Sequence, residues 1–416
     1  MSLRFYSALI VLFFFLTPAA LAQQALTIQD CISLARENNP RLVQSRTSIQ
    51  RANAGVTLAH SSYYPTFDLS SRYRNTETFS GEREGSYSTS ISLDYPLYRG
   101  GYRRAAVKAA LVEVDVAEES YRFSESQVVL EVKQAFFKIL QKEEQIALTE
   151  DMVNRRNEDL VLIRLKYDSG RESLPAVEEA AASILRAEYE KKRAEEELAL
   201  AKIDLNLLLS RPRRAEVSLE YTSNEAEMPS LAVLIEEAKA ERSELRSEKA
   251  NTGALEAQVI QARSSYFPTV SLSSSLGWQG SEFLEQTNDW SFGVNLSLPI
   301  FDGFSTKVKV QQATLSLENQ EARIREVEEM IEEEIEQAYS TWELARSIIE
   351  VNERTLEAAR NMYRLTKLQY EQGLSSYFFL QQKESDLTQA ENSKLDALFN
   401  LRVSRARLEK TLGRIN

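Results

Sequence analysis

Residues 290–299 read WSFGVNLSLP, with a large apolar side chain at every second position until the proline. This alternation places apolar side chains on one face of a β-strand and polar or small ones on the other. A strand of about ten residues with aromatic residues near its ends is typical of one that has lipid on one side and water on the other. A strand of a soluble sandwich alternates equally well, so the pattern alone leaves both interpretations open.

The same alternation occurs in three other segments, so we expect four strands, over residues 66–74, 86–96, 269–278 and 289–299. Four strands cannot close a membrane barrel, whose minimum is about eight, and open sheet edges are not tolerated in lipid. Two copies of the chain would give eight strands and a lumen filled by side chains, whereas three copies would give twelve and room for water. We therefore expect neighbouring copies to share one barrel.

The sequence contains an internal repeat of two similar halves. SSYYPT at 61–66 returns as SSYFPT at 264–269, an offset of 268 − 65 = 203, and PLYRG at 96–100 returns as PIFDG at 299–303 with the same offset. A register that stays fixed over so many residues indicates two structurally equivalent halves. We expect a first repeat over 23–210, an equatorial linker over 211–230 and a second repeat over 231–416.

Each half also contains a very long helix. Residues 102–168 and 304–371 are free of proline and rich in Ala, Glu, Leu, Lys and Arg, with apolar residues at alternating steps of three and four. Helices near 70 residues span on the order of 100 Å and are expected to pack as coiled coils. Shorter helices are predicted over 28–62 and 231–265, with return helices over 175–209 and 376–412, so that two short helices stack beside each long one.

A proline lies near each expected change between helix and strand. Its ring removes a backbone donor and restricts the residue before it, which fits a change of backbone geometry. We therefore predict helix–strand junctions at Pro65, Pro96, Pro268 and Pro299.

Residues 1–22 resemble a secretory signal. Arg4 precedes an apolar run over residues 8–16, and Ala20-Leu21-Ala22 forms a small-residue end, so cleavage is expected before Gln23. The alternative, an N-terminal membrane anchor, is disfavoured because the run is shorter than the roughly 20 residues that a span needs.

The composition argues against several classes of protein. The 50 basic and 62 acidic residues give a formal charge of −12, which disfavours a nucleic-acid binder. His60 is the only histidine, which leaves no credible His-based metal cluster or Ser-His-Asp arrangement. The acidic run over 326–336 is most simply a solvated helix face. We therefore expect no catalytic site, no metal and no cofactor.

In this order the motifs resemble the TolC-like outer membrane efflux protein family. The resemblance rests on Leu26-Thr27-Ile28, on ARENNPRL at 35–42, on the Tyr-Pro and Phe-Pro pairs that open the strands, on the chain end at 408–413 and on two paired helical tips. The tips read Tyr167-x-x-Gly170-x-x-Ser173 and Tyr370-x-x-Gly373-x-x-Ser376. Each motif is weak singly, but their order in both halves is specific.

The resemblance implies an α+β homotrimer in the outer membrane of a diderm bacterium. Four strands per subunit would make a twelve-stranded β-barrel, continued through the periplasm by an α-helical coiled-coil barrel. It also implies a periplasmic adaptor (membrane fusion) protein and an inner-membrane pump of the RND, ABC or MFS type, in an efflux or type I secretion system. By similarity, the six tip residues would serve adaptor docking and gating. Gly170 and Gly373 are also explained as turn glycines with positive φ.

One departure from the family concerns the periplasmic mouth. Well-studied relatives narrow it with acidic residues six and nine positions after the second tip glycine, where this chain has Phe379 and Gln382. The corresponding first-half positions are Ala176 and Glu179, with Glu178 adjacent. A ring of Glu178 or Glu179 from three subunits would attract cations at a constriction, whereas a solvated helix face explains the same residues.

Two other classes of protein would account for part of the sequence. A periplasmic coiled-coil adaptor or structural protein would explain the signal and the helices but not the four strands and their repetition. An enzyme would need a polar cluster with turnover, for which the sequence offers no candidate.

Overall fold

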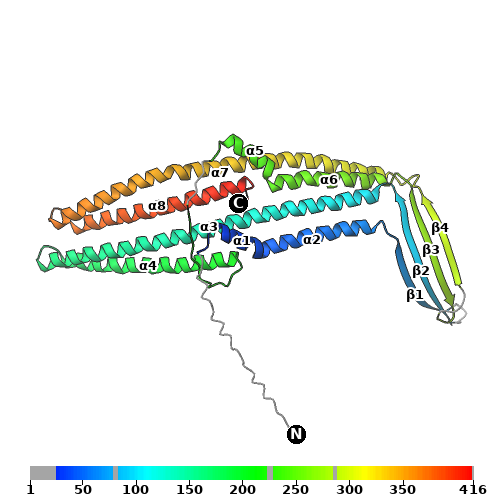
Figure 1. The fold of residues 1–416 in the computed structure, drawn as a ribbon, viewed down its shortest axis with the longest axis horizontal. Helices are drawn as coiled ribbons and strands as arrows, with labels where there is room; N and C mark the ends of the chain where they lie inside the picture. Colours follow the sequence, from blue (N-terminus) through cyan, green and yellow to red (C-terminus); the bar gives the residue numbers. More distant parts are fainter. Residues whose placement is uncertain (1–24, 78–82, 223–227, 284–287, 415–416) are drawn as a thin grey trace, which may run out of the picture.

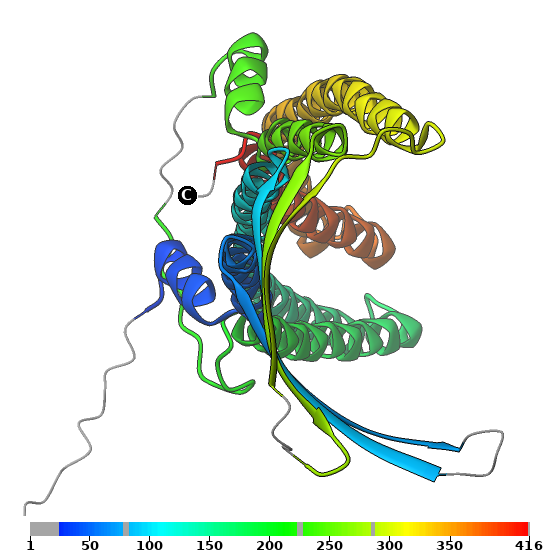
Figure 2. The ribbon, with the colours of Figure 1, turned by 90° about the vertical axis from the view of Figure 1, so that its right-hand side faces the viewer.

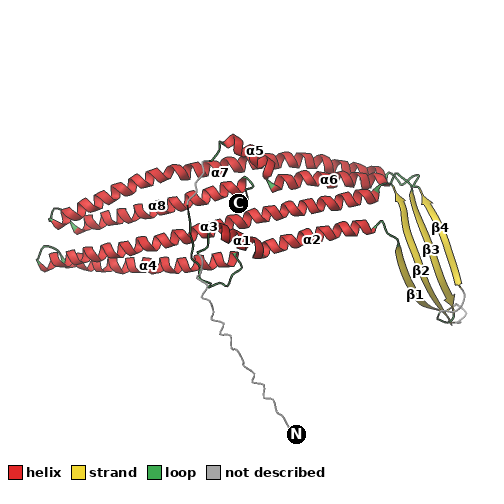
Figure 3. Ribbon diagram, viewed as in Figure 1, coloured by secondary structure: helices red, strands yellow, loops and turns green. Residues whose placement is uncertain are grey.

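The computed structural model describes residues 25–77, 83–222, 228–283 and 288–414. The predicted signal at 1–22 lies outside these residues. The protein is a long rod of helices with one four-stranded sheet at one end and two helical hairpin tips at the other (Figures 1 and 3). None of the described helices is both long enough and apolar enough to cross a bilayer.

Two 67-residue helices, α3 (Tyr102–Asp168) and α7 (Ser305–Glu371), run the length of the rod. Each turns at its tip into a 35-residue return helix, α4 (Leu174–Leu208) after α3 and α8 (Tyr377–Thr411) after α7. The absence of proline and of interior glycine in these four helices, apart from Pro175 in the first turn of α4, permits such uninterrupted length.

The helices predicted over 28–62 and 231–265 are each broken in two, which corrects the sequence prediction. The first consists of α1 (Ile28–Asn38) and α2 (Pro40–Ser61), because Pro40 holds Asn39 in an extended conformation. The second consists of α5 (Leu231–Glu241) and α6 (Ser243–Ser264). Its break at Arg242 has no proline; the buried Arg242 guanidinium instead binds Glu244 and, on α7, Glu334 at 2.8 Å.

The helices form one curved layer. Near the tips the neighbours are α4, α3, α8 and α7 in that order, and near the sheet they are α2, α3, α6 and α7. The shorter helices stack end to end in two pairs, α2 on α4 and α6 on α8. In the first pair Asn39 Nδ2 donates to the Leu208 carbonyl, and in the second Arg242 Nη1 donates to the Thr411 carbonyl. Figure 2 shows α1 and α5 together on one side of this layer. The outer members of the layer are therefore α2 with α4 on one edge and α7 on the other.

The sheet is antiparallel and its strands follow chain order. They are β1 (Thr66–Glu77), β2 (Arg83–Arg99), β3 (Thr269–Gly280) and β4 (Asn288–Ser297). The register sets Leu69 opposite Ile91, Ile91 opposite Leu276 and Leu276 opposite Trp290, so one face is apolar across all four strands. The other face is mainly serine, threonine, asparagine and glycine, with hydroxyl pairs such as Ser70 and Ser90 at 2.9 Å.

The junction prolines differ in their surroundings. Pro65 and Pro268 come just before β1 and β3, and Pro299 follows the end of β4. The prediction for Pro96 is wrong, because β2 continues to Arg99 and Pro96 lies inside it, opposite Ser271. A register shift between Pro96 and Tyr98 accommodates the missing backbone donor.

Three apolar clusters hold the layer together. One joins α1 to α3 and the end of α4 around Cys31 and Phe136, and a second joins α5 to α7 and α8 around Ile331 and Leu408. Burial raises the pKa of the Cys31 thiol to about 11, as expected for a packed residue. Part of the segment predicted as a linker reaches the first cluster, where Leu26 N–H donates to the Ser218 carbonyl. The third cluster lies at the tips.

Candidate functional site at the helical tips

Both tips are tight turns closed by the same backbone bonds. The Gly170 and Gly373 N–H groups donate to the Tyr167 and Tyr370 carbonyls, and both glycines have positive φ, +71° and +79°. In the single subunit no atom lies within 4 Å of where a Cβ would stand on either glycine. The turn-glycine explanation therefore accounts for their conformation, and their outer surface remains open for contact.

The two equivalent tip tyrosines differ sharply in exposure. Tyr167 is 40 % exposed, whereas Tyr370 is only 2 % exposed. The Tyr370 hydroxyl donates to Glu172 Oε2 at 2.9 Å, and the Lys166 ammonium lies 4.2 Å from its ring centroid and donates to its carbonyl. Burial raises the pKa of Tyr370, and the hydrogen bond to the Glu172 carboxylate raises it further. Tyr370 is buried in this conformation, so the prediction that it forms a docking surface is wrong. It lies between the two hairpins and joins them.

The tip serines begin the return helices. Ser376 caps α8, where its Oγ accepts the Phe379 N–H at 3.3 Å, while the Ser173 N–H donates to the Glu172 carboxylate at 3.0 Å. The two serines therefore have local structural roles in addition to any contact with a partner.

The four predicted constriction residues do not converge within one subunit. The Glu179 carboxylate binds Arg186 at 2.5 Å and accepts a hydrogen bond from Gln381 Nε2 at 3.1 Å. Both hydrogen bonds lower the pKa of Glu179, and the bond from Arg186 has the larger effect. Glu178 is exposed. Phe379 lies under the Lys383 ammonium at 5.3 Å, and Gln382 donates to Asp386. Glu179 therefore contacts α8 through Gln381, one residue from the predicted Gln382.

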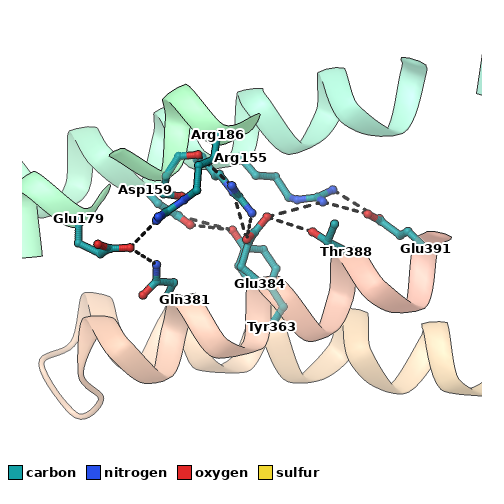
Figure 4. Close-up of polar contacts among 11 residues, drawn as sticks. Arg155, Asp159, Glu179, Arg186, Tyr363, Gln381, Glu384, Thr388 and Glu391 are labelled. Atoms are coloured by element: carbon teal, nitrogen blue, oxygen red, sulfur yellow. Dashed lines mark hydrogen bonds and ion pairs between the residues drawn. The ribbon is translucent and has the colours of Figure 1, made fainter. Parts of the chain in front are cut away.

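A charged network that the sequence did not predict lies between the hairpins (Figure 4). Arg155 of α3 binds Glu391 of α8 with both terminal nitrogens, at 2.9 and 3.4 Å. Arg156 binds Glu384 at 3.1 Å and also donates to the Ser183 carbonyl of α4. Glu384 is 4 % exposed, so its charge is almost fully removed from water and depends on these guanidinium groups.

A second set of contacts joins α3 directly to α7. The Tyr363 hydroxyl donates to Asp159 Oδ2 at 3.2 Å, and Lys367 lies 3.2 Å from Asp159 Oδ1 and 3.0 Å from Glu158. Burial raises the Asp159 pKa, and Lys367 opposes that shift. Around this set, apolar side chains from both hairpins form the third buried cluster: Leu160, Ile163, Ala180, Ile184, Leu356, Tyr363, Tyr370, Leu380, Leu387 and Ala390. Separating the tips requires breaking both polar and apolar contacts.

This network can hold two hairpins together, but it offers no evident reaction chemistry. Throughout the part of the chain that the structure describes, no three His, Cys, Asp or Glu side chains are grouped so as to hold a metal. The guanidinium and carboxylate groups neutralise one another across the helix interface. The arrangement therefore links the α3–α4 hairpin to the α7–α8 hairpin.

The pattern that defines the outer membrane efflux protein family matches residues 31–211 and again residues 234–414. The chain therefore belongs to the outer membrane efflux protein family. Protein CyaE of Bordetella pertussis is 26 % identical over 373 residues, which cover 87 % of this chain and 78 % of CyaE.

Solved structures show the same fold. The crystal structure of CusC matches with a TM-score of 0.81 at 19 % identity, over 92 % of this chain and 91 % of that one. VceC of Vibrio cholerae matches with a TM-score of 0.79 at 18 % identity, over 93 % and 96 %. The resemblance and the predicted fold class are confirmed. The sheet accordingly belongs to an outer membrane barrel and the helices to a periplasmic tunnel.

Proposed function

We propose that three copies of the chain form one outer membrane channel, the exit duct of a tripartite efflux or type I secretion system. The observation that carries this proposal is the sheet. Its apolar face is exposed, and among the described residues the outer edges of β1 and β4 have no partner strand within the subunit. In lipid such edges must be paired. Three subunits give twelve strands, enough for a water-filled lumen.

The helical layer supports the same assembly. Its α7 edge exposes apolar residues at helical spacing, namely Val308, Leu315, Met330, Leu344 and Val351. Its opposite edge, formed by α2 and α4, exposes another set, namely Val43, Leu58, Leu185, Leu200 and Leu207. Two different apolar seams on opposite edges of a curved layer fit head-to-tail contacts that close into a ring.

The inner wall of the proposed duct is the face opposite α1 and α5. A groove of about 1190 Å³ lies there, between α3, α4, α7 and α8. Gln134 and Lys138 of α3 are among its lining residues, and Leu344 of the α7 edge also borders it. On the other side of α3, Val132 and Phe136 pack against α1. The mixed polar and apolar lining suits passage of varied cargo.

We infer that the energy and the choice of cargo come from partners. A periplasmic adaptor and an inner-membrane pump of the RND, ABC or MFS type would supply them, and the chain itself would act as a conduit and not as an enzyme. Relatives named "Cation efflux system protein CusC" support an efflux role. A periplasmic adaptor or structural protein is the less favoured alternative, because it would leave the apolar sheet face exposed to water.

Conductance across a planar bilayer tests the proposed function and the proposed acidic constriction together. Wild-type protein is expected to form water-filled channels that prefer cations. Glu178→Gln should lower that preference because it removes three charges from the ring, whereas Glu178→Asp should retain it. Protein that inserts but never conducts contradicts the channel, and equal selectivity of wild type and Glu178→Gln contradicts a constriction formed by Glu178.

Docking at the tips is tested by Tyr167→Ala. Loss of an exposed aromatic anchor is expected to weaken adaptor binding roughly tenfold, because such residues dominate interface energies. Bilayer conductance should stay unchanged. Tyr266→Ala is the matched control, since Tyr266 is similarly exposed but lies at the sheet end of the rod. Equal adaptor affinity for the wild type and Tyr167→Ala, measured by surface plasmon resonance, would refute this role.

A further inference from the structure

The groove in the inner wall holds two positive charges that the internal repeat does not explain. By the offset of 203 residues, Lys138 of α3 corresponds to Thr341 of α7, and Arg407 of α8 corresponds to Asp204 of α4. All four residues line the groove. A structural need common to both halves would favour similar residues at equivalent positions, so the two charges are a feature of this surface and not of the shared fold.

Lys138 has no acidic partner. Its ammonium donates to the Gln141 side-chain oxygen at 3.0 Å and lies 5.1 Å from the Phe399 ring centroid. The amide and the ring are both neutral, and within the described part of the chain Lys138 forms no ion pair. The positive charge at this end of the groove therefore has no counter-charge in contact with it.

The surroundings of Lys138 disfavour its charged form. Partial burial and repulsion from Lys142 lower the pKa of Lys138, and Glu197 and Asp396 counteract this only in part. Both carboxylates are already engaged, since Glu197 binds Lys142 and Asp396 accepts a hydrogen bond from Gln141. An anion in contact with the Lys138 ammonium would stabilise its charged form.

Arg407 supplies the second uncompensated charge. It is exposed and has neither a hydrogen bond nor an ion pair with any residue that the structure describes. Phe399, Val403 and Arg407 follow one another at steps of four, which places them on one face of α8 over about 12 Å. The floor of the groove thus runs from Lys138 above Phe399, across an apolar stretch, to Arg407.

The acidic residues of the groove do not cancel these charges. Glu131 pairs with Arg41 at 2.6 Å, so these two compensate each other. Asp204 is exposed on α4 and forms no ion pair with a described residue. Two free cations therefore share the groove with one free carboxylate.

The groove also has the size of a small-molecule site. Its volume of about 1190 Å³ exceeds the roughly 300–1,000 Å³ of pockets that take drug-sized ligands, so it has room for such a molecule together with water. The floor is apolar at Ala135, Phe399 and Val403. Leu207 and Leu344 stand at the two rims, within the proposed subunit seams, and are left to those contacts.

We propose that the groove binds an amphipathic organic anion, with a sulfonate, sulfate or carboxylate head at Lys138 and an apolar body on Phe399 and Val403. The inference rests on the proposed function, because the groove faces a lumen only in the assembled channel. Arg407 attracts the same ligand from the far end and repels organic cations. A neutral molecule of the same shape gains the apolar contacts but leaves the Lys138 charge unpaired. With three such sites, the wall of the channel would select among its cargo.

Isothermal titration calorimetry with naphthalene-2-sulfonate and the detergent-solubilised wild-type trimer tests the site. We expect saturable binding of one ligand per chain. The neutral analogue 2-naphthalenemethanol should bind at least tenfold more weakly, because it lacks the charge-assisted hydrogen bond to Lys138. Equal affinities for the two compounds would mean that the groove recognises only an apolar body, and would overturn the inference.

Variants locate the binding. Lys138→Gln should weaken the binding of naphthalene-2-sulfonate at least tenfold, and Lys138→Arg should retain it because the charge remains. Arg407→Gln should weaken it about threefold, since that charge acts over a longer distance. Arg164→Gln is the matched control, because it removes an exposed arginine of α3 that lies outside the groove, and it should bind like the wild type. Wild-type affinity in Lys138→Gln would refute the site.

Conductance separates this inference from the proposed function. Wild-type protein that forms conducting trimers but binds no naphthalene-2-sulfonate overturns the anion site and leaves the channel intact. Wild-type protein that forms no trimer, or trimers that never conduct, contradicts the proposed function. Loss of binding in Lys138→Gln with unchanged conductance supports both.

Discussion

Glu384→Ala is expected to open the periplasmic end of the channel and raise its bilayer conductance severalfold. Glu384 is almost fully buried and is the carboxylate that binds Arg156, with Arg155 also within 4.0 Å. Removing one partner of a buried ion pair typically costs about 3–5 kcal/mol, because the other charge is left without compensation. The ion pair is lost in all three subunits of the proposed trimer. In each subunit this loss weakens the contact between the two hairpins.

Matched variants separate opening from misfolding. Glu384→Gln keeps the size and a hydrogen-bonding oxygen, so its conductance should lie between those of wild type and alanine. Glu150→Ala removes the partner of Lys191 from an exposed pair within the α3–α4 hairpin and should have no effect. Circular dichroism should report unchanged helix content in each variant. If well-folded Glu384→Ala trimers conduct like the wild type, the network does not keep the tips together.

The second large effect is expected from Val351→Asp, which should abolish the trimer. Val351 is 56 % exposed in one subunit and lies seven residues beyond Leu344 on the α7 seam. In the proposed ring it is covered by the neighbouring α4 edge, so a carboxylate there would be removed from water without a partner. Burial of an unpaired charge costs several kcal/mol, and the ring contains three such sites.

Heat-resistant trimer bands on gels measure this effect. Val351→Leu should keep the trimer because it preserves the apolar surface. Leu200→Asp, on the opposite seam, should reproduce the defect because it acts on the other side of the same interface. Persistence of full trimer yield in Val351→Asp would show that α7 does not form the subunit contact.

Much of the fold could be predicted because its signals are local and periodic. The strands follow from period-two alternation, and the long helices follow from heptad spacing without proline. Pro40 is also a local signal for the break before α2, although one helix was predicted over residues 28–62. The break at Arg242 has no such signal, since it depends on a contact with Glu334 that only the folded layer creates.

Only part of the structure at the tips could be predicted from the sequence. Gly170 and Gly373 could be predicted as turn residues, because only their own backbone conformation matters. The burial of Tyr370 could not, since Tyr167 occupies the equivalent position and is exposed. The charged network is also absent from the repeat: the counterparts of Arg155 and Arg156 are alanines. Which charges become buried depends on how one hairpin packs on the other, and no periodic pattern records that.

Native mass spectrometry of the detergent-solubilised protein tests the central claim most directly. If the four strands of each subunit close a shared barrel, the particle that survives gentle removal of detergent should contain three chains. A particle of one chain, stable in detergent at micromolar concentration, would contradict the account, because it would leave both edges of the sheet unpaired.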